Sequence, residues 1–112
     1  AESVAELPKW TDGIKRYGVD VVDSADEVLK RCDAVLLMSI DGRAHLSQLK
    51  PILKAGKPVY VGRPLAASLA DAVAVFRLAK ETGTPIFSCS QHRFSPGFIG
   101  MRTHEDVGTV LG

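Results

Sequence analysis

Three short apolar runs recur along this chain at nearly equal intervals. They read "AVLLMS" from residue 34, "PVYVG" from residue 58 and "PIFSCS" from residue 85. None alternates cleanly between apolar and polar residues, which is typical of strands covered on both faces in a parallel sheet. The intervals of 24 and 27 residues leave room for one helix each time, so the rhythm predicts consecutive βαβ units. A shorter strand is predicted at "VDVV", residues 19–22.

The segments between these runs carry helix signals. Ser24 with Glu27, and Ser68 with Asp71, have the spacing of capping boxes, in which the serine oxygen accepts a backbone N–H. Behind the second box lies one apolar stripe at helical spacing, which we expect to be the packing face: Leu69, Ala72, Val73, Phe76 and Ala79.

One helix-ending device occurs twice, in "AGKPVYV" and "TGTPIFS". Gly56 and Gly83 stand where a residue in the left-handed conformation ends a helix. Pro58 and Pro85 follow two residues later and open the next strand, where a missing N–H is tolerated. The repetition supports the βαβ interpretation.

The two ends of the chain are harder to assign. Pro8, Trp10 and Gly13 argue against one long helix in the first 16 residues, for which we expect a short helix and a loop. The tail "HEDVGTVLG" predicts a turn and the start of a further apolar run. No low-complexity linker divides the chain, so residues 1–112 are expected to form one domain that is incomplete at both ends.

Composition excludes several classes of protein. A net charge of +1 with both signs intermixed argues against a nucleic-acid partner, and no apolar run approaches the roughly 20 residues of a membrane span. The N-terminus lacks the pattern of a signal peptide. Cys32 and Cys89 fit no metal-ligand spacing, so we expect reduced, buried thiols, no metal site and a cytoplasmic protein.

Polar residues follow all three apolar runs. In an open parallel sheet, ligands bind beyond the carboxyl ends of the strands. This rule selects three segments: Ser39-Ile40-Asp41-Gly42 with His45, Gly62-Arg63-Pro64, and Ser90-Gln91-His92-Arg93. We expect Asp41, Arg63 and Arg93 to share one crevice. Plainer roles stay open: a helix cap for Asp41, packing for His45 and His92, and surface ion pairs for the arginines.

These motifs together resemble a known family. The stretch from "CDAVLLMSIDGRAH" through "AGKPVYVGRPLA" to "SCSQHRFSP" looks like the nucleotide-binding domain of the Gfo/Idh/MocA oxidoreductases, over about residues 14 to 112. The resemblance implies a Rossmann-like, three-layer α/β domain with a parallel sheet, lacking its first βαβ half and the C-terminal α+β domain. It also implies NAD or NADP as cofactor and, for the full-length protein, a homo-oligomer.

The resemblance carries over residue by residue. Ser39 stands where the family has Thr, Asp41 where it has Asp or Asn, and His45 matches the family histidine, so this turn would line the nicotinamide-ribose side of the cofactor pocket. Gly62, Arg63 and Pro64 match Glu-Lys-Pro, whose proline commonly follows a cis peptide. The residues implied to bind cofactor are Ser39, Ile40, Asp41, His45, Gly62, Arg63, Pro64 and Arg93, with Arg63 at the catalytic lysine position.

Two departures from the family pattern bear on function. Arginine replaces a lysine that could relay a proton, and Gly62 replaces the acid beside it; arginine effectively never deprotonates. No "GxGxxG" turn occurs in the 112 residues. We therefore expect part of an NAD(P)-dependent oxidoreductase that moves a hydride to or from a hydroxyl-bearing carbon of a sugar, cyclitol or related compound. Two alternatives stay open, a catalytically inactive relative that binds a nucleotide or sugar, and an unrelated phosphate-binding α/β module.

Overall fold

The computed structural model describes residues 2–101 and 104–106, and its contacts divide the chain into two units, Ala1–Cys32 and Asp33–Gly112. Each unit is described by itself. The apolar run predicted at the end of the tail falls on residues 107–112, outside the described residues. The second unit holds the sheet, and the assignment of residues 1–112 to one domain stays a prediction.

The first unit contains two helices, α1 (Glu2–Lys15) and α2 (Ala25–Arg31). The prediction of a short helix plus loop at the N-terminus is wrong, because α1 runs through Pro8 for 14 residues. Pro8 removes the one N–H that would bond to the Val4 carbonyl, and the remaining intrahelical bonds are unaffected. One proline did not outweigh the helical preference of its neighbours.

The strand predicted at residues 19–22 is also wrong, since these residues have no regular structure. A strand needs a partner, and the sheet among the described residues contains β1, β2 and β3 alone. Asp20 instead accepts a hydrogen bond from Arg31 at 3.3 Å. The cap before α2 is confirmed: the Glu27 N–H donates to Ser24 Oγ at 3.3 Å.

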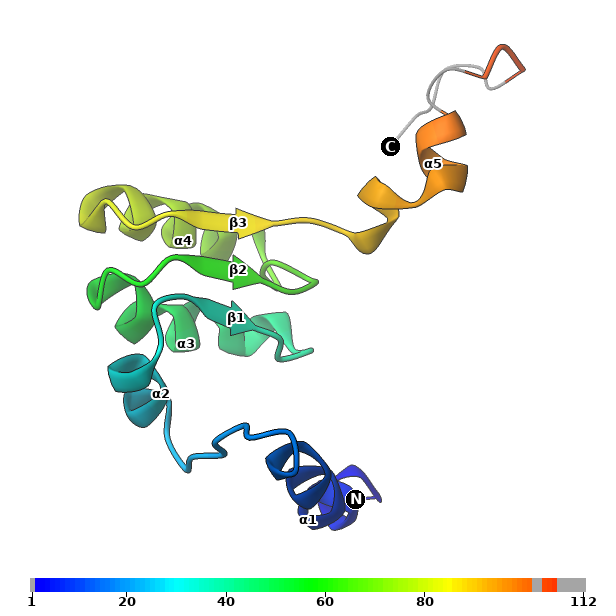
Figure 1. Ribbon diagram of the computed structural model, residues 1–112. Coiled ribbons are helices and arrows are strands. Elements are labelled where there is room, and N and C mark those ends of the chain that lie inside the picture. Colours follow the sequence, from blue (N-terminus) through cyan, green and yellow to red (C-terminus); the bar gives the residue numbers. More distant parts are fainter. Residues whose placement is uncertain (1, 102–103, 107–112) are drawn as a thin grey trace. The chain divides into compact units, whose positions relative to one another are not determined.

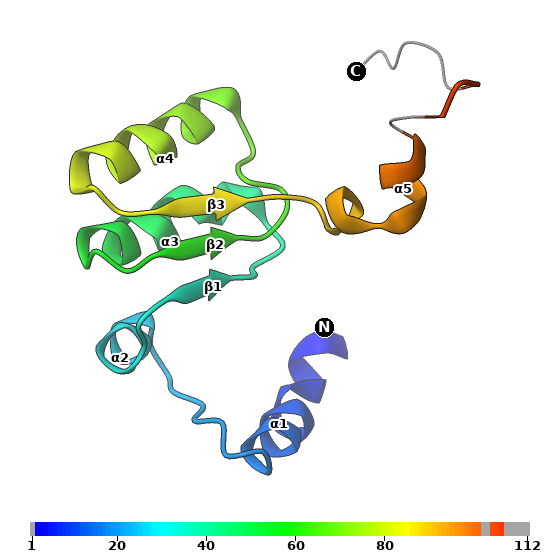
Figure 2. The ribbon, with the colours of Figure 1, turned by 45° about the horizontal axis from the view of Figure 1, so that its top comes forward.

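The second unit is a βαβαβ arrangement, which confirms the Rossmann-like prediction. Its elements are β1 (Val35–Leu37), α3 (Gly42–Lys54), β2 (Val59–Val61), α4 (Leu69–Thr82), β3 (Ile86–Ser88), the 3-10 helix η1 (Gln91–Phe94) and α5 (Pro96–Met101). The strands are parallel and ordered β1-β2-β3. Figures 1 and 2 show α3 and α4 side by side on one face of this sheet.

The hydrophobic core lies between the sheet and these two helices. Its fully buried side chains come from α3, β2 and α4: Leu49, Leu53, Val61 and Val75. The buried Thr84 hydroxyl joins the layers by donating to the Leu53 carbonyl at 2.8 Å.

The opposite face of the sheet carries an aligned row of large side chains. The strand register places Leu36 beside Tyr60 and Tyr60 beside Phe87. Leu36 is 74% exposed and Phe87 51% exposed. The sequence predicted strands covered on both faces. Within this unit helices cover one face of the sheet, so its described residues supply two of the three Rossmann layers.

Helix α4 begins and ends as predicted but does not pack as predicted. Ser68 Oγ accepts the Asp71 N–H at 3.1 Å, and Gly83 has a φ of 64°. The expected packing stripe is wrong in part, because Leu69, Val73 and Phe76 are exposed. The buried residues of the helix are Val75 and Ala79 instead, and the helix packs beside α3. The three exposed side chains line a shallow groove together with the stems of Arg77 and Lys80.

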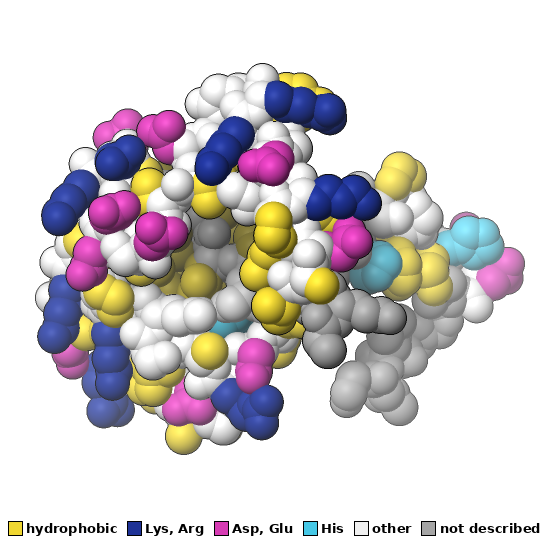
Figure 3. Space-filling model, turned by 90° about the horizontal axis from the view of Figure 1, so that it is seen from below, with side chains coloured by type: hydrophobic (Ala, Val, Ile, Leu, Met, Phe, Trp, Pro, Cys, Tyr) yellow, Lys and Arg dark blue, Asp and Glu magenta, His cyan; other side chains and the backbone are white. Residues whose placement is uncertain are grey.

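The surface carries charges of both signs (Figure 3), and the two cysteines are less buried than predicted. Lys and Arg side chains are interspersed with Asp and Glu on the face seen in Figure 3. Among residues 2–101 and 104–106, no helix has the length and apolarity needed to cross a membrane, and no group of three acidic, His or Cys side chains could hold a metal ion. Cys32 and Cys89 are unpaired and half-buried.

Candidate functional site

All three strands point the same way, so their carboxyl ends meet at one edge of the sheet (Figure 1). The Gly62 N–H donates to the Leu37 carbonyl at 2.8 Å and extends the pairing of β1 and β2 to this edge. The three segments selected from the sequence follow here. We call this edge, comprising residues 38–42, 62–67 and 89–93, the rim.

The first rim segment ends in a capped helix. Asp41 accepts the Arg43 N–H at 3.0 Å as the N-cap of α3 and also pairs with the Arg43 guanidinium at 2.8 Å. Hydrogen bonds from Arg43 lower the pKa of Asp41 to about 2, so the carboxylate is charged at neutral pH. Ile40, which precedes the cap, is 89% exposed. Asp41 is thus a cap, and its carboxylate still reaches solvent at the rim.

His45 lies one turn into α3 and is fully buried, with 0% of its surface exposed. Its Nε2 lies 2.7 Å from the Ser39 carbonyl oxygen, and its Nδ1 lies 3.0 Å from the Leu65 carbonyl oxygen. The Ser39 hydroxyl donates to the Gln48 side chain at 2.6 Å. His45 therefore joins the first and second rim segments, and its ring nitrogens are both occupied by the protein itself.

Gly42 and Pro64 mark a close approach between the same two segments. A Cβ added to Gly42 would lie 2.9 Å from the Ala66 carbonyl carbon, 2.9 Å from Pro64 Cγ and 3.0 Å from the Ala67 nitrogen. Real Cβ atoms do not approach backbone so closely, so this position requires glycine. The sequence analysis placed Gly42 in the first of the three segments and missed this steric role.

The second rim segment has the geometry that the resemblance implies at its proline. The Arg63–Pro64 peptide is cis. Gly62 is buried against β1, where an added Cβ would lie 3.2 Å from the Leu37 carbonyl oxygen. The absence of a side chain at residue 62 therefore matches a tight contact with the neighbouring strand.

Arg63 is linked to the third rim segment. Its guanidinium donates to Ser90 Oγ at 2.8 Å, and the same oxygen accepts the His92 N–H at 3.2 Å as the cap of η1. Ser90 therefore replaces the missing carboxylate as the group that orients the cation, although a hydroxyl cannot neutralise it.

Tyr60 adds a phenol at the same edge that the sequence analysis missed. Its hydroxyl donates to the Cys89 carbonyl at 3.0 Å, and its ring lies 5.8 Å from that of Phe87. Partial burial and then the Cys89 side chain raise the pKa of Tyr60 above its ordinary value, while the Arg63 charge lowers it. A tyrosine within an otherwise aliphatic strand, "VYV", was the signal available.

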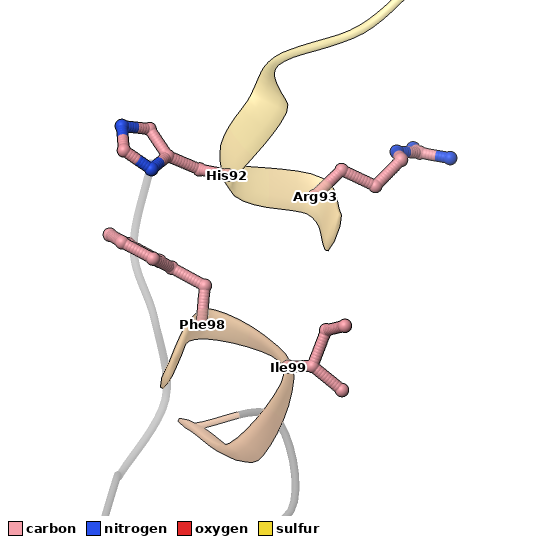
Figure 4. A pocket seen from close by; sticks show the side chains of 4 residues that line it. All are labelled: His92, Arg93, Phe98 and Ile99. Atoms are coloured by element: carbon pink, nitrogen blue, oxygen red, sulfur yellow. The ribbon is translucent and has the colours of Figure 1, made fainter. Parts of the chain in front are cut away.

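Arg93 lies in η1 and lines an open hollow of about 410 Å³ with His92, Phe98 and Ile99. Figure 4 shows the His92 and Phe98 rings facing each other, at 4.7 Å between centroids, while Arg93 extends in another direction. The hollow belongs to η1 and α5.

The structure thus joins the rim segments in pairs. His45 and Gly42 hold the first to the second, and Ser90 holds the second to the third. Within the described part of the chain, no hydrogen bond or ion pair joins Asp41, Arg63 and Arg93 to one another; each has its own neighbours. The shared crevice for these three side chains stays a prediction.

A family model described as "Oxidoreductase family, NAD-binding Rossmann fold" (GFO_IDH_MocA) matches residues 4–89, well over half of the chain. The chain belongs to this family.

Two curated relatives and one solved structure illustrate the relationship. The chain is 33% identical over 91 residues to myo-inositol dehydrogenase Hyg17 of Streptomyces leeuwenhoekii, covering 80% of this chain and 28% of that protein. It is 37% identical over 98 residues to 4-carboxy-2-hydroxymuconate-6-semialdehyde dehydrogenase of a Sphingobium species, covering 86% and 29%. The structure of GenD2 from gentamicin A biosynthesis in complex with NAD has a TM-score of 0.72 at 25% identity, covering 81% and 26%.

The chain therefore spans somewhat over a quarter of the length of the curated Gfo/Idh/MocA relatives that it matches. Members of this family have an NAD-binding Rossmann fold, and in open parallel sheets ligands bind beyond the carboxyl ends of the strands. The roles of individual rim residues toward a ligand are taken up next.

Proposed function

We propose that this chain is part of an NAD(P)-dependent oxidoreductase that moves a hydride to or from a hydroxyl-bearing carbon of a sugar, cyclitol or related compound. The observation that carries the proposal is the fixed cation beside the cis-proline at the end of β2: Arg63, held by Ser90 at 2.8 Å. The proposal covers the longer protein to which such a domain belongs, because the relatives extend well beyond the matched region.

The rim suits the nicotinamide end of the cofactor. At the end of β1, Ser39 contributes backbone groups and Ile40 an exposed apolar side chain. Asp41 contributes a charged carboxylate that reaches solvent. No glycine-rich turn that would cradle a pyrophosphate occurs in the 112 residues. We therefore assign these residues, with Gly62 and Pro64, to the nicotinamide-ribose half. The bound dinucleotide supplies the hydride chemistry.

Arg63 is the residue that we assign to the reacting oxygen. Its guanidinium is exposed and its direction is set by one hydrogen bond, so it can donate to an alkoxide or carbonyl oxygen where negative charge develops. It cannot accept and release a proton during turnover, because arginine remains charged. Another group must then accept the hydroxyl proton when the substrate is oxidised. Arg93, on η1, is assigned to the periphery of the same pocket.

The substrate class rests on the relatives' names. One relative acts on myo-inositol and another on a semialdehyde, so the proposal is centred on hydroxyl-bearing carbons of polyols and their carbonyl products. The two unpaired cysteines favour a reducing compartment, the cytoplasm. A homo-oligomer of the complete protein is part of the proposal.

A second candidate is a catalytically inactive relative that binds a nucleotide or sugar. The replacement of the family's Glu-Lys pair by Gly62 and Arg63 favours it, because this removes both the titratable cation and its carboxylate.

Two measurements on the protein that contains this chain separate the candidates. Calorimetric titration with NAD and NADP tests binding, and the absorbance of reduced nicotinamide tests turnover on a panel of polyols that includes myo-inositol. We expect Arg63→Met to lower kcat/KM by about a hundredfold, the loss typical of one donor to a developing oxyanion. Arg77→Met, a matched change of an exposed arginine on α4, should leave it unchanged. Dinucleotide binding without turnover would select the inactive relative, and no binding of either dinucleotide would reject the oxidoreductase.

A further inference from the structure

The two partners of the buried His45 ring are both backbone carbonyl oxygens. Ser39 O lies 2.7 Å from Nε2, and Leu65 O lies 3.0 Å from Nδ1. One carbonyl follows β1 and the other follows β2, so the ring sits between two rim segments that are 26 residues apart in sequence. No buried side-chain nitrogen or oxygen among the described residues lacks a hydrogen-bond partner.

A carbonyl oxygen can only accept a hydrogen bond, whereas a neutral imidazole has one N–H and one bare nitrogen. In either neutral tautomer one of the two contacts would bring two lone pairs together inside the protein, where water cannot compensate. A ring with a proton on each nitrogen satisfies both carbonyls. The Nε2 distance of 2.7 Å is at the short end of the range for N–H···O hydrogen bonds, as a charged donor favours.

We propose that His45 is a doubly protonated imidazolium that clamps the Ser39 and Leu65 carbonyls together and thereby fixes the spacing of the first two rim segments. It is a positioning residue, because a fully buried ring with both nitrogens occupied cannot touch a ligand. The state of the ring is independent of the proposed function, whereas its effect on dinucleotide binding rests on that function.

The charged groups around the ring are compatible with a buried cation. On α3 these are Arg43, Lys50 and Lys54, with Asp41 as its cap; Arg63 lies on the second rim segment, and α4 carries Asp71, Arg77, Lys80 and Glu81. Asp41 is the carboxylate that interacts with His45 electrostatically, and it stays ionised because Arg43 hydrogen-bonds to it. The two carbonyl oxygens are the direct partners of the imidazolium, and the Asp41 charge acts on it through space.

The clamp also acts where the backbone is most crowded. Gly42, three residues before His45, is the point at which α3 meets Pro64 and Ala66. Steric contact sets how closely the two segments can approach, and the ring holds them at that distance. Loss of either ring N–H of His45 would let residues 38–42 and 62–67 separate.

Ring-nitrogen NMR of the intact ¹⁵N-histidine-labelled protein at neutral pH tests the proposal without a ligand. We expect two directly bonded N–H groups for His45, assigned by their loss in His45→Leu or, if that variant does not fold, in His45→Gln. A spectrum with one bare ring nitrogen at His45 would overturn the proposal.

Hydrogen exchange and binding test the positioning role. In His45→Leu, amide exchange in residues 38–42 and 62–67 should rise about tenfold or more, the effect of losing one charge-assisted hydrogen bond. His45→Gln keeps one amide donor for the Ser39 carbonyl, so its rise in amide exchange should be smaller than that of His45→Leu. The matched control His104→Leu, at an exposed histidine, should show no rise in these segments.

Dinucleotide affinity should fall most in His45→Leu, less in His45→Gln, and not at all in His104→Leu. Exchange and affinity unchanged in His45→Leu would reject the positioning role. If the wild-type protein binds no dinucleotide, the proposed function fails, while the ring spectrum and the exchange data still decide the clamp.

Discussion

The closest approach at the rim predicts that Gly42→Ala destabilises the second unit. The new methyl group would lie 2.9 Å from the Ala66 carbonyl carbon and from Pro64 Cγ, and 3.0 Å from the Ala67 nitrogen. Two of these three atoms are backbone, so a side-chain rotation cannot relieve the overlap. Either α3 or residues 64–67 must move.

The size of the effect follows from two opposing terms. Inserting one methyl group into a tightly packed site costs about 1–3 kcal/mol. Replacing glycine by alanine in a helix returns up to about 1 kcal/mol, and less than that in the first turn. We therefore expect the free energy of unfolding to fall by about 1–2 kcal/mol, which lowers Tm by roughly 5–15 °C for a unit of this size.

The assay is thermal and urea unfolding followed by far-UV circular dichroism, with Gly97→Ala as the matched control. Gly97 also lies in the first turn of a helix, α5, but has no atom within 4 Å of an added Cβ. Its substitution should be neutral or slightly stabilising. A Gly42→Ala protein as stable as Gly97→Ala would refute the steric reasoning and, with it, the crowded contact on which the rim geometry depends.

Three further predictions concern single side chains. Arg63→Lys should introduce a new limb into the pH–rate profile, because lysine can titrate and arginine cannot; a profile of unchanged shape would show that the exchange has no consequence for proton transfer and would contradict this prediction. The pKa of Tyr60 is raised, so its contribution to stability is present below the ordinary tyrosine range and lost as pH rises through the raised value. Tyr60→Phe should therefore flatten the alkaline decline in stability, and an identical decline would contradict the assignment. The pKa of Asp41 is lowered to about 2, so its contribution is present above the ordinary aspartate range and lost as pH falls toward 2. Acid unfolding curves of Asp41→Asn should therefore show a smaller loss of stability below pH 4, roughly the unfolded aspartate value, than the wild type.

The elements of the second unit were predictable because each carries a local signal with one physical meaning. The serine before α4 accepts a backbone N–H, and Gly56 and Gly83 adopt positive φ, as the sequence indicated. The apolar runs became parallel strands in the expected order, although each is three residues long.

The errors share a different cause, which is that pairing and packing are not local. "VDVV" has the composition of a strand but no neighbouring strand to pair with among the described residues. Pro8 carries a helix-breaking signal whose cost is limited to one hydrogen bond. The apolar stripe of α4 predicted a packing face, but the residues that the helix buries are Val75 and Ala79.

At the site, the sequence located the segments and not their contacts. The rule that ligands bind beyond the carboxyl ends of parallel strands identified the residues at all three strand ends. That Ser90 binds Arg63, and that both nitrogens of His45 face carbonyls, depends on side-chain directions that spacing does not encode. The same holds for Gly42, whose importance comes from a segment more than 20 residues away.

The two prolines that open β2 and β3 have a consequence for how this protein can change. Each proline carbonyl accepts an N–H from the neighbouring strand, Val35 to Pro58 at 2.9 Å and Val59 to Pro85 at 3.0 Å. The alignment of all three strands is thus anchored at their amino-terminal ends, far from the rim. Substitutions at the other ends can therefore accumulate without shifting one strand past another. A glycine and an arginine can thus occupy the positions at which the resemblance implies an acid and a lysine, while the pairing of the strands is kept.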